Sequence, residues 1–428
     1  MITTSRREFI KATGLIGAGL SLGTSSLQAS TNSVPTAVPV NDWEKFRQLF
    51  PLDFNYAHFA NFLVTAHCEP IRAAIDAHRA RLDRNPALAM DYDRQEVWQH
   101  EHEVRTQAAR YLNVLPGQIA LTGSTTEGLS IVYSGVRLKP GQEILTTVHE
   151  HYSTRYALQY RTQREGAVVR KISLFQTPHE ASEDQILDTI SRSIRPETRV
   201  LGMTWVHSGS GVKLPIGKIG ELVREKNKDR ADDERIIYCV DGVHGFGVEN
   251  LSFPEMNCDY FISGTHKWMF GPRGTGIICA ASENSNDLIP FSATFSEAKN
   301  FGTTFTPGGY HSFEYRWAAS KAFELHLQLG KAAVQSRIHE LNDYLKQQLK
   351  TLKGVELVTP TSSALSAGFT FFRITGQDDE QLAAYLNQNR IMVDSVSRDA
   401  GPVVRMAPGL LNTEAEVDRA IQLLAKKV

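Results

Sequence analysis

The chain has 428 residues, of which 41% are hydrophobic and 22% charged, so it can bury large cores and is expected to form two domains. Its formal net charge of −1 gives no reason to expect a nucleic acid or an anionic membrane surface as partner. A small-molecule substrate is the expectation that remains.

The first thirty residues differ in composition from the rest. Residues 5–11 read Ser-Arg-Arg-Glu-Phe-Ile-Lys, and a run rich in Gly, Ala and Leu follows, with small residues up to Ala29. This pattern is typical of a twin-arginine export signal and is too short and too rich in glycine for a stable membrane span. We therefore expect a signal at 1–29, export of the folded protein by the twin-arginine translocase, and a periplasmic location.

Four cysteines are few for an oxidising compartment. Three of them, Cys239, Cys258 and Cys279, lie in apolar strand-like runs, and the fourth is Cys68. We expect buried free thiols rather than disulfides. No His/Cys group has the spacing of a zinc site, so no metal is expected.

An N-terminal arm is expected at 30–60, and Asn61 lies just beyond it, before an amphipathic helix opened by Pro70. A short strand at 119–121 then leads into a helix that begins at Ser124. Ser124 and Glu127 have the spacing of a capping box, which presents backbone N–H groups and the positive end of the helix dipole. Such a helix start can bind phosphate, but many capping boxes bind nothing.

The next strands are expected at 143–148, 168–174 and 198–206, with helices at 182–194 and from Pro215. The first of these strands ends in His149-Glu150-His151-Tyr152, where an aromatic ring can lie flat on a planar cofactor. The third ends in His207-Ser208-Gly209-Ser210-Gly211, a small polar tip that lets the backbone approach a ligand. Each of these ends can equally be an ordinary turn.

Asp241 ends the apolar strand expected at 236–240. A carboxylate at the end of a buried parallel strand costs several kcal/mol unless a cation meets it. The protonated ring nitrogen of a pyridine cofactor would be such a cation. The alternative is that Asp241 caps the following helix.

Lys267 follows an apolar strand that starts at Cys258, and it precedes the apolar residues 268–270 and a Gly-Pro-Arg-Gly turn. A lysine at the carboxyl edge of a parallel sheet lies where α/β enzymes bind ligands. Apolar neighbours desolvate its ammonium, which lowers the pKa and makes the amine a nucleophile and base. We therefore expect Lys267 to bond a cofactor.

The composition changes after residue 302. Residues 305–311 are rich in turn formers and include Gly309, and a long helical stretch is expected at 314–352. A final helix is capped by Thr413 and Glu416. Arg405 lies within an apolar strand, where its planar fork suits a carboxylate, although a structural salt bridge is the alternative. Three further strands are expected, at 355–358, 367–374 and 391–395.

These motifs resemble the class V aminotransferase group of fold-type I pyridoxal-phosphate (PLP) enzymes, and especially its isopenicillin N epimerase-like branch. They are also similar to exported PLP enzymes that tailor pyoverdine siderophores in the periplasm. The resemblance implies an α/β fold with a mostly parallel sheet in a large domain at 61–313. It also implies a smaller α+β C-terminal domain at 314–428, and a homodimer.

The resemblance also implies roles for residues. Lys267 would bond PLP and act as the base, and Asp241 would hold the ring nitrogen. Other expected cofactor contacts are Thr125 and Thr126 on the phosphate, His151 stacked on the ring, His244 at the ring hydroxyl, His266 beside the lysine, and Gly309 reaching the neighbouring subunit's phosphate. Expected substrate contacts are Arg405, Asn61 and His207. The match at Gly309 is partial, because Gly308-Gly309 stands where Gly-Thr is more usual.

The expected activity is an aminotransferase-type change to the glutamyl side group of a siderophore precursor. An epimerase or a C–S (β-) lyase is the alternative within the enzymes. Cysteine desulfurase is disfavoured, because residues 394–405, where such enzymes carry their reactive cysteine, contain none. A periplasmic ligand-binding protein that retains the fold is the alternative outside the enzymes.

Overall fold

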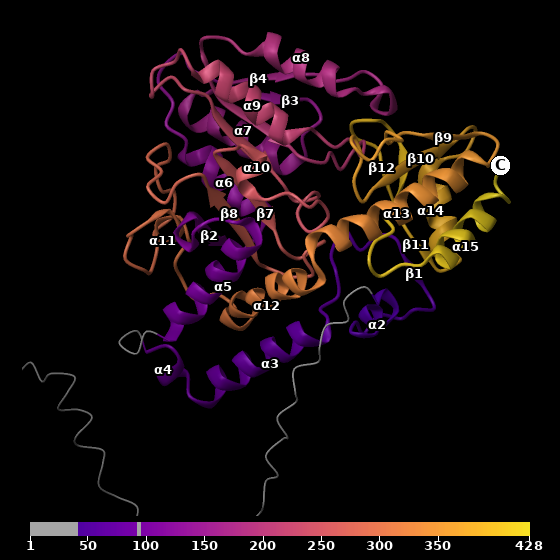
Figure 1. Ribbon diagram of the computed structural model, residues 1–428, viewed down its shortest axis with the longest axis horizontal. Coiled ribbons are helices and arrows are strands. Elements are labelled where there is room, and N and C mark those ends of the chain that lie inside the picture. The colour runs from indigo at the N-terminus through magenta and orange to yellow at the C-terminus, as the bar shows by residue number, and fades with distance from the viewer. Residues whose placement is uncertain (1–41, 92–95) are drawn as a thin grey trace, which may run out of the picture. The chain divides into compact units, whose positions relative to one another are not determined.

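The computed structural model describes residues 42–91 and 96–428 (Figure 1). The expected export signal at 1–29 and the first part of the expected arm lie outside these residues. Within the described part of the chain, no helix combines the length and the hydropathy needed to cross a bilayer.

A seven-stranded sheet carries the central part of the chain, in the order β2-β8-β7-β6-β5-β3-β4. β8 runs antiparallel to both of its neighbours, β7 and β2, and the other four pairings are parallel, so the expectation of a mostly parallel sheet is confirmed. The strands are β2 (Ile119–Thr122), β3 (Glu143–Thr147), β4 (Val168–Ile172), β5 (Thr198–Thr204), β6 (Ile237–Asp241), β7 (Tyr260–Gly264) and β8 (Gly276–Ala280).

Helices cover both faces of this sheet because the central strands are apolar on both faces. On β6, Ile237 and Cys239 face the core under two helices, α6 (Thr125–Gly135) and α7 (Tyr152–Glu165). Tyr238 and Val240 point to the other face, in agreement with the two-residue period of a strand. The helices that contribute to that second core include α5 (Glu96–Leu112), α8 (Glu183–Ser193), α9 (Ile216–Asn227) and α12 (Phe313–Leu329).

The single helical stretch expected at 314–352 is two helices. Gly330 has a φ of 81°, a left-handed conformation that ends α12, and α13 (Lys331–Lys350) starts at the next residue. Figure 1 shows α13 continuing from α12 toward the second sheet. The remaining helices outside that sheet are α2 (Trp43–Gln48), α3 (Glu69–Arg84), α4 (Pro86–Ala89), α10 (Phe253–Met256), α11 (Phe301–Thr304), η2 (Pro116–Gln118) and η3 (Pro178–Glu180).

The second sheet is antiparallel, in the order β12-β13-β10-β9, and forms the expected smaller α+β part. Its strands are β9 (Val355–Leu357), β10 (Thr370–Ile374), β12 (Asp394–Val396) and β13 (Val403–Met406), and its helices are α14 (Asp379–Gln388) and α15 (Glu414–Leu424). The N-terminal segment joins this part, because β1 (Ala57–His58) pairs with β11 (Ile391–Met392). The domain boundaries drawn from the sequence stay predictions.

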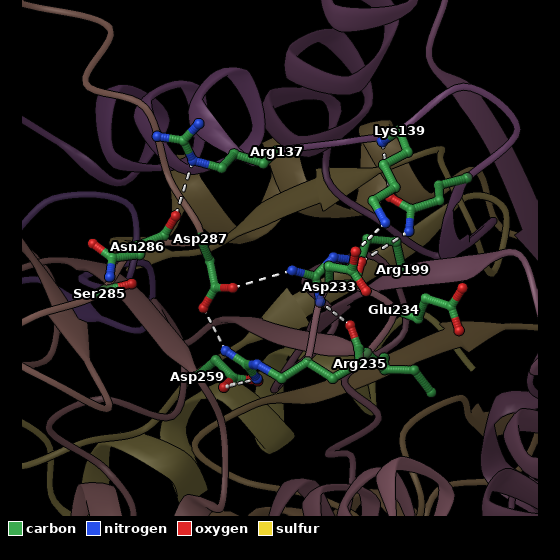
Figure 2. A network of polar contacts seen from close by, with 12 residues as sticks. Arg137, Lys139, Arg199, Asp233, Glu234, Arg235, Asp259, Ser285, Asn286 and Asp287 are labelled. Carbon is green, nitrogen blue, oxygen red and sulfur yellow. Dashed lines mark hydrogen bonds and ion pairs between the residues drawn. The ribbon is translucent and has the colours of Figure 1, made fainter. Parts of the chain in front are cut away.

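An ion-pair network closes the amino edge of the large sheet (Figure 2). Arg235, just before β6, bonds Asp259, just before β7, at 2.8 Å, and also pairs with Asp287. Arg199 in β5 reaches Asp287 at 3.1 Å. These pairs join three neighbouring strands and the segment after β8 at the edge opposite the expected ligand site.

Candidate active site

A cavity of about 800 Å³ lies at the carboxyl ends of β5, β6 and β7. This is the edge at which open α/β sheets bind ligands. Eight of the residues expected from the sequence line it: Thr125, Thr126, His151, Asp241, His244, His266, Lys267 and Arg405. The chain therefore brings together side chains that lie up to 280 residues apart in the sequence.

Lys267 follows β7 by three residues and is half-buried. Burial, opposed by Asp241 and helped by the nearby Arg405 and Arg398, lowers the pKa of its amine to about 8. The apolar residues 268–270 were expected to surround the lysine, but the ring of Phe270 packs against Phe46 and Phe50. Near neutral pH the amine therefore has a far larger unprotonated fraction than an ordinary lysine.

Trp268 fixes the tautomer of the imidazole beside this amine. Its indole Nε1–H donates to His244 Nδ1 at 3.4 Å, and an indole nitrogen can only donate. Burial lowers the pKa of His244 well below its usual value, so the ring is neutral and carries its proton on Nε2. Nε2 lies 3.2 Å from Lys267 Nζ, so it can donate to the lone pair of the amine when the amine is unprotonated. The geometry and the lowered lysine pKa agree.

Asp241 is the last residue of β6 and is 3% exposed. Its Oδ1 accepts a hydrogen bond from Val243 N at 3.2 Å. Among the described residues, no lysine or arginine forms an ion pair with it, and burial raises its pKa to about 6. A cation brought into the cavity would meet an acid that has no other partner of opposite charge.

Helix α6 begins where the sequence predicts a phosphate site, but its N-cap differs from the expected capping box. Ser124 Oγ accepts from Glu127 N at 3.1 Å, but the Glu127 carboxylate bonds Gly123 N and not Ser124 N, so the capping box is incomplete. Thr125 Oγ1 accepts from Gly264 N at 2.7 Å. This bond ties the start of α6 to the strand that leads to Lys267, with the N–H groups of α6 at the cavity.

His151 is the N-cap of α7, and its Nδ1 accepts from Ser153 N at 3.2 Å, which fixes the ring. Burial and the positive charges nearby lower its pKa to about 3, so the ring is neutral. A fixed neutral imidazole at the cavity wall is suited to stacking on a planar ligand.

Three expected contacts do not line the cavity. His207 is completely buried, and its ring lies against those of His149 and Phe175, so its neighbour Ser208 lines the cavity instead. Asn61 is also outside, although Phe62 and Leu63 line the wall. Gly309 lies in a separate crevice between α5 and the start of α12. Its expected role concerns a neighbouring subunit and stays a prediction.

Arg405 is engaged inside the protein, which corrects the picture of a free carboxylate clamp. Its Nε donates to Asp394 at 2.7 Å, its Nη2 pairs with the same carboxylate, and its Nη1 donates to the Ser208 carbonyl at 2.7 Å. Arg398, which the sequence reading missed, also lines the cavity and makes one hydrogen bond, from Nη2 to Ser208 Oγ at 2.9 Å. Arg398 therefore brings a second guanidinium to the wall of the cavity, beside Arg405.

Glu150 is a second buried acid that sequence reasoning missed. Thr147 Oγ1 donates to it at 2.8 Å, and Thr204, which lines the cavity, bonds it through both its hydroxyl and its N–H. Burial raises the pKa of Glu150 to about 7, and the charge of Asp241 adds to the rise. The only sequence signal was its place directly before His151 at a strand end.

All four cysteines are free and buried, as expected, and none lines the cavity. Burial raises the pKa of each thiol. The described residues contain no group of three or more His, Cys, Asp or Glu side chains placed to hold a metal ion. The cavity therefore offers no described thiolate to accept sulfur.

The residues present fit PLP. The buried Asp241 forms no ion pair with a described residue and suits a protonated pyridine nitrogen, while the start of α6 suits a phosphate. His151 offers a ring for stacking, and Lys267 offers an amine of lowered pKa for a covalent bond to an aldehyde.

Comparisons with known proteins agree with this fit. The model of the aminotransferase class-V family matches residues 67–419. An isopenicillin N epimerase of Amycolatopsis lactamdurans is 28% identical over 365 residues, or 81% of this chain and 89% of that protein. A probable cysteine desulfurase of Xylella fastidiosa is 26% identical over 428 residues, or 93% of this chain and 98% of that protein.

Solved structures share the fold. A complex of the cystine C–S lyase C-DES with cysteine persulfide has a TM-score of 0.76 at 21% identity, over 87% of this chain and 97% of that one. A cysteine desulfurase from Thermococcus onnurineus in its apo form has a TM-score of 0.75 at 19% identity, over 90% of this chain and 98% of that one. Since the family model covers most of the chain, this protein belongs to the aminotransferase class V family and is a PLP-dependent enzyme.

Proposed function

We propose that the protein is a periplasmic PLP enzyme that acts on the free amino group of a siderophore (pyoverdine-type) precursor. It would change the glutamyl side group of that precursor by aminotransferase-type chemistry. The observation that carries the proposal is one cavity that brings together three groups: the Lys267 amine with its lowered pKa, Asp241, which forms no ion pair with a described residue, and the guanidinium of Arg398.

PLP, when bound, supplies an electron sink for the carbanion that forms when an amino compound loses its α-proton. Lys267 Nζ is the base that takes this proton, and it can return the proton to another carbon once the substrate has displaced it. His244 Nε2, oriented by Trp268, lies within hydrogen-bond distance of Lys267 Nζ and helps to position it. Asp241 favours proton loss by keeping a positive charge at the ring nitrogen.

Arg398 orients the substrate. A guanidinium at the cavity wall, bonded from Nη2 to Ser208, can bond a carboxylate in a two-pronged geometry, which a glutamyl group provides. Arg405, held by Asp394 and Ser208, adds positive charge behind it. Together they favour an acidic amino substrate and set the side from which Lys267 meets its α-proton.

Epimerisation is the second candidate, because isopenicillin N epimerases are among the relatives of comparable length. That reaction returns the proton to the same carbon. Sulfur transfer is disfavoured, since none of the cysteines lines the cavity. A pure binding protein is disfavoured because it has no use for a lysine amine of lowered pKa beside a buried acid.

The test is incubation of the purified holoenzyme with a glutamyl-bearing siderophore precursor in D₂O, read by mass spectrometry. Transamination removes the amine and is the expected result, and siderophore from cells that lack the gene should keep that amine. Retention of the amine with one deuteron and inverted configuration would assign epimerisation. No exchange and no mass change would reject both activities for this substrate.

The location and the assembly are part of the same proposal. The twin-arginine pattern at 5–11 supports export, and the resemblance supports a homodimer in which Gly309 reaches the partner's cofactor phosphate. Cell fractionation tests the location: replacement of Arg6 and Arg7 by Lys should keep the protein in the cytoplasm. Sedimentation velocity tests the dimer.

A further inference from the structure

His149 follows β3 and is held from two sides by residues that follow β4. Its ring stacks on that of Phe175, with centroids 4.0 Å apart and planes within 16° of parallel. The backbone N–H of Leu174 donates to its Nε2 at 3.1 Å. A backbone N–H can only donate, so Nε2 carries no proton and the proton of the ring lies on Nδ1.

The Nδ1 proton is donated to Asp399, which belongs to the connection between β12 and β13. His149 Nδ1 lies 2.6 Å from Asp399 Oδ1, and the two side chains are buried, with 5% and 9% of their area exposed. A short buried hydrogen bond from a fixed imidazole to a carboxylate holds both groups in one geometry. We call this pair the His149–Asp399 latch. It ties the connection to the end of β3 in the large sheet.

The connection packs closely against the large sheet and has an uncommon backbone. Residues 397–402 contain no helix or strand, and Asp399 has a φ of 61°, a left-handed conformation that Asp and Asn adopt more readily than most residues. A Cβ atom at Gly209, in the polar tip after β5, would lie 2.7 Å from the Asp399 Cβ atom. Glycine at this position therefore lets the latch close.

Arg398 directly precedes Asp399 and lines the cavity. Its Nη2 donates to Ser208 Oγ at 2.9 Å. One bond at the tip leaves a long side chain much of its rotational freedom, and a ligand that fixes the side chain must overcome that entropy. The latch fixes the backbone one residue away, so it sets the point from which the Arg398 side chain reaches the cavity.

We propose that His149 and Asp399 are positioning residues that hold Arg398 where it can bond the carboxylate of the substrate. This inference rests on the proposed function, in which Arg398 binds that carboxylate, and it assigns the selectivity for an acid to a pair of residues behind the cavity wall. Neither His149 nor Asp399 lines the cavity, so the latch acts on substrate binding and not on proton transfer.

The test compares two probes with the same free α-amine: γ-L-glutamyl ethylamide, and the same compound with its α-carboxylate converted to a carboxamide. Binding is measured by calorimetry on holoenzyme reduced with borohydride, in which no turnover occurs. We expect the wild-type protein to bind the acid about tenfold more tightly than the amide, because a guanidinium bonds a carboxylate more strongly than a neutral amide.

Two substitutions of Asp399 keep its backbone conformation and differ in the latch. Asn and Gly both tolerate a left-handed φ, but only Asn offers an oxygen to His149 Nδ1. Asp399→Asn should therefore keep the tenfold preference, and Asp399→Gly should reduce it to below about threefold. An unchanged preference in Asp399→Gly overturns the proposal. Equal losses in both variants would make the charge of Asp399 responsible in place of the hydrogen bond, and would overturn it too.

The other half of the latch gives a coupling test. His149→Phe keeps a ring against Phe175 and removes both hydrogen bonds, so it should lower the preference as Asp399→Gly does. Because the two residues act as one pair, the double variant should lose no more preference than either single variant. Losses that multiply in the double variant would show that the two residues act separately, which contradicts the latch.

Arg373→Met is the matched control. Arg373 Nη2 donates to the carbonyl of Ala400 at 2.9 Å, so this substitution removes a different hold on the same connection. The variant should keep the preference for the acid, even where its thermal stability falls. A loss of preference equal to that of Asp399→Gly would make general loosening of the connection the cause and overturn the specific role of the latch.

Exchange of the α-proton in D₂O by the unreduced holoenzyme separates this inference from the proposed function. Asp399→Gly should exchange the acid probe at the wild-type rate at saturation and need a severalfold higher concentration to reach half of it. A slower rate at saturation with the same half-saturation would overturn the positioning role. Exchange without any acid preference in the wild type rejects the latch and leaves the chemistry in place. An acid preference that depends on the latch, without exchange, rejects the proposed chemistry alone.

Discussion

The two edges of the large sheet differ in whether their charged side chains form ion pairs. At the amino edge, Arg199 forms a salt bridge with Asp287, and Arg235 forms salt bridges with both Asp259 and Asp287 (Figure 2). At the carboxyl edge, the same strand β6 ends in Asp241, which has no ion-pair partner among the described residues. One strand therefore begins in a neutralised network and ends in an acid exposed to a cavity.

The difference shows which charges serve the fold and which serve a ligand. A paired edge joins strands and resists disruption, since removing one partner leaves the other without its counter-charge. At the carboxyl edge, burial without a salt bridge destabilises the charged forms of Asp241 and Lys267. The pKa of Asp241 is therefore raised to about 6, and that of Lys267 is lowered to about 8. The substitutions below test this contrast.

The largest expected effect is that of Lys267→Ala. Only this lysine is proposed to bond the cofactor and move the α-proton, so covalent attachment should be lost and exchange should fall by roughly a hundred- to ten-thousandfold. Mass spectrometry after borohydride reduction checks the attachment.

Lys331 is the matched control. Burial also lowers its pKa to about 8, but its Nζ donates to the carbonyls of Tyr111 and Leu251, away from the cavity. Lys331→Ala should lower thermal stability and keep the cofactor label on Lys267. A label on Lys331 in the native protein would contradict the assignment.

The second effect is that of Asp241→Asn. In the apoprotein, a pKa of about 6 in place of 3.8 means that the ionised form costs roughly 3 kcal/mol, so the amide should raise the free energy of unfolding at pH 7.5 by up to that amount. The holoenzyme should behave in the opposite sense. With PLP bound, the amide no longer keeps the ring nitrogen protonated, and exchange should slow by roughly ten- to hundredfold.

The stability gain that we expect for the Asp241→Asn apoprotein should depend on pH. Because the folded pKa is raised, the Asp241 contribution favours the folded apoprotein below pH 3.8 and is lost as the pH rises through about 6. The gain from Asp241→Asn should therefore appear between these values and be absent below pH 4. Denaturant unfolding of both apoproteins from pH 4 to pH 8 measures it, and a constant difference would exclude titration of Asp241 as its cause.

Asp287→Asn is the same chemical change at the other edge and should have the opposite sign. Asp287 accepts bonds from Arg199 and Arg235, so the amide leaves two guanidinium groups short of an anion. We expect a loss of about 1 to 3 kcal/mol in apoprotein and holoenzyme alike. Denaturant unfolding at pH 7.5 checks this, with cofactor content and exchange rate as controls. A stabilised Asp287→Asn protein would remove the contrast between the edges.

The functional ends of strands were predictable because buried parallel strands read as apolar runs and their carboxyl ends meet at one edge. Lys267, Asp241 and His151 each follow such a run. The fold class was predictable for the same reason, through the alternation of strands and helices between residues 119 and 280. Free, buried cysteines followed from their places in apolar segments.

The rest depended on packing that no local pattern encodes. Arg398 lies in the connection between β12 and β13, and it reaches the cavity because this connection meets the segment after β5, where Arg398 bonds Ser208. The pairing of Arg405 with Asp394 follows from the register of two short strands. His207 was misplaced because the side to which a residue points beyond the end of β5 depends on the exact turn, which here buries its ring against His149.

The smallest expected effect separates the two cavity arginines. Arg398→Lys keeps the positive charge and removes the planar fork, so kcat/KM for an acidic amino substrate should fall about tenfold while PLP content and thermal stability stay close to wild type. Arg405→Lys should act differently, because it breaks a two-pronged pair with Asp394 and a bond to the Ser208 carbonyl. Its losses in stability and PLP content should accompany its loss in kcat/KM. The measurement is all three quantities for both variants. If Arg405→Lys lowered kcat/KM alone and Arg398→Lys changed nothing, the substrate carboxylate would bind Arg405 in spite of its internal bonds, and the sequence expectation would hold over the structural one.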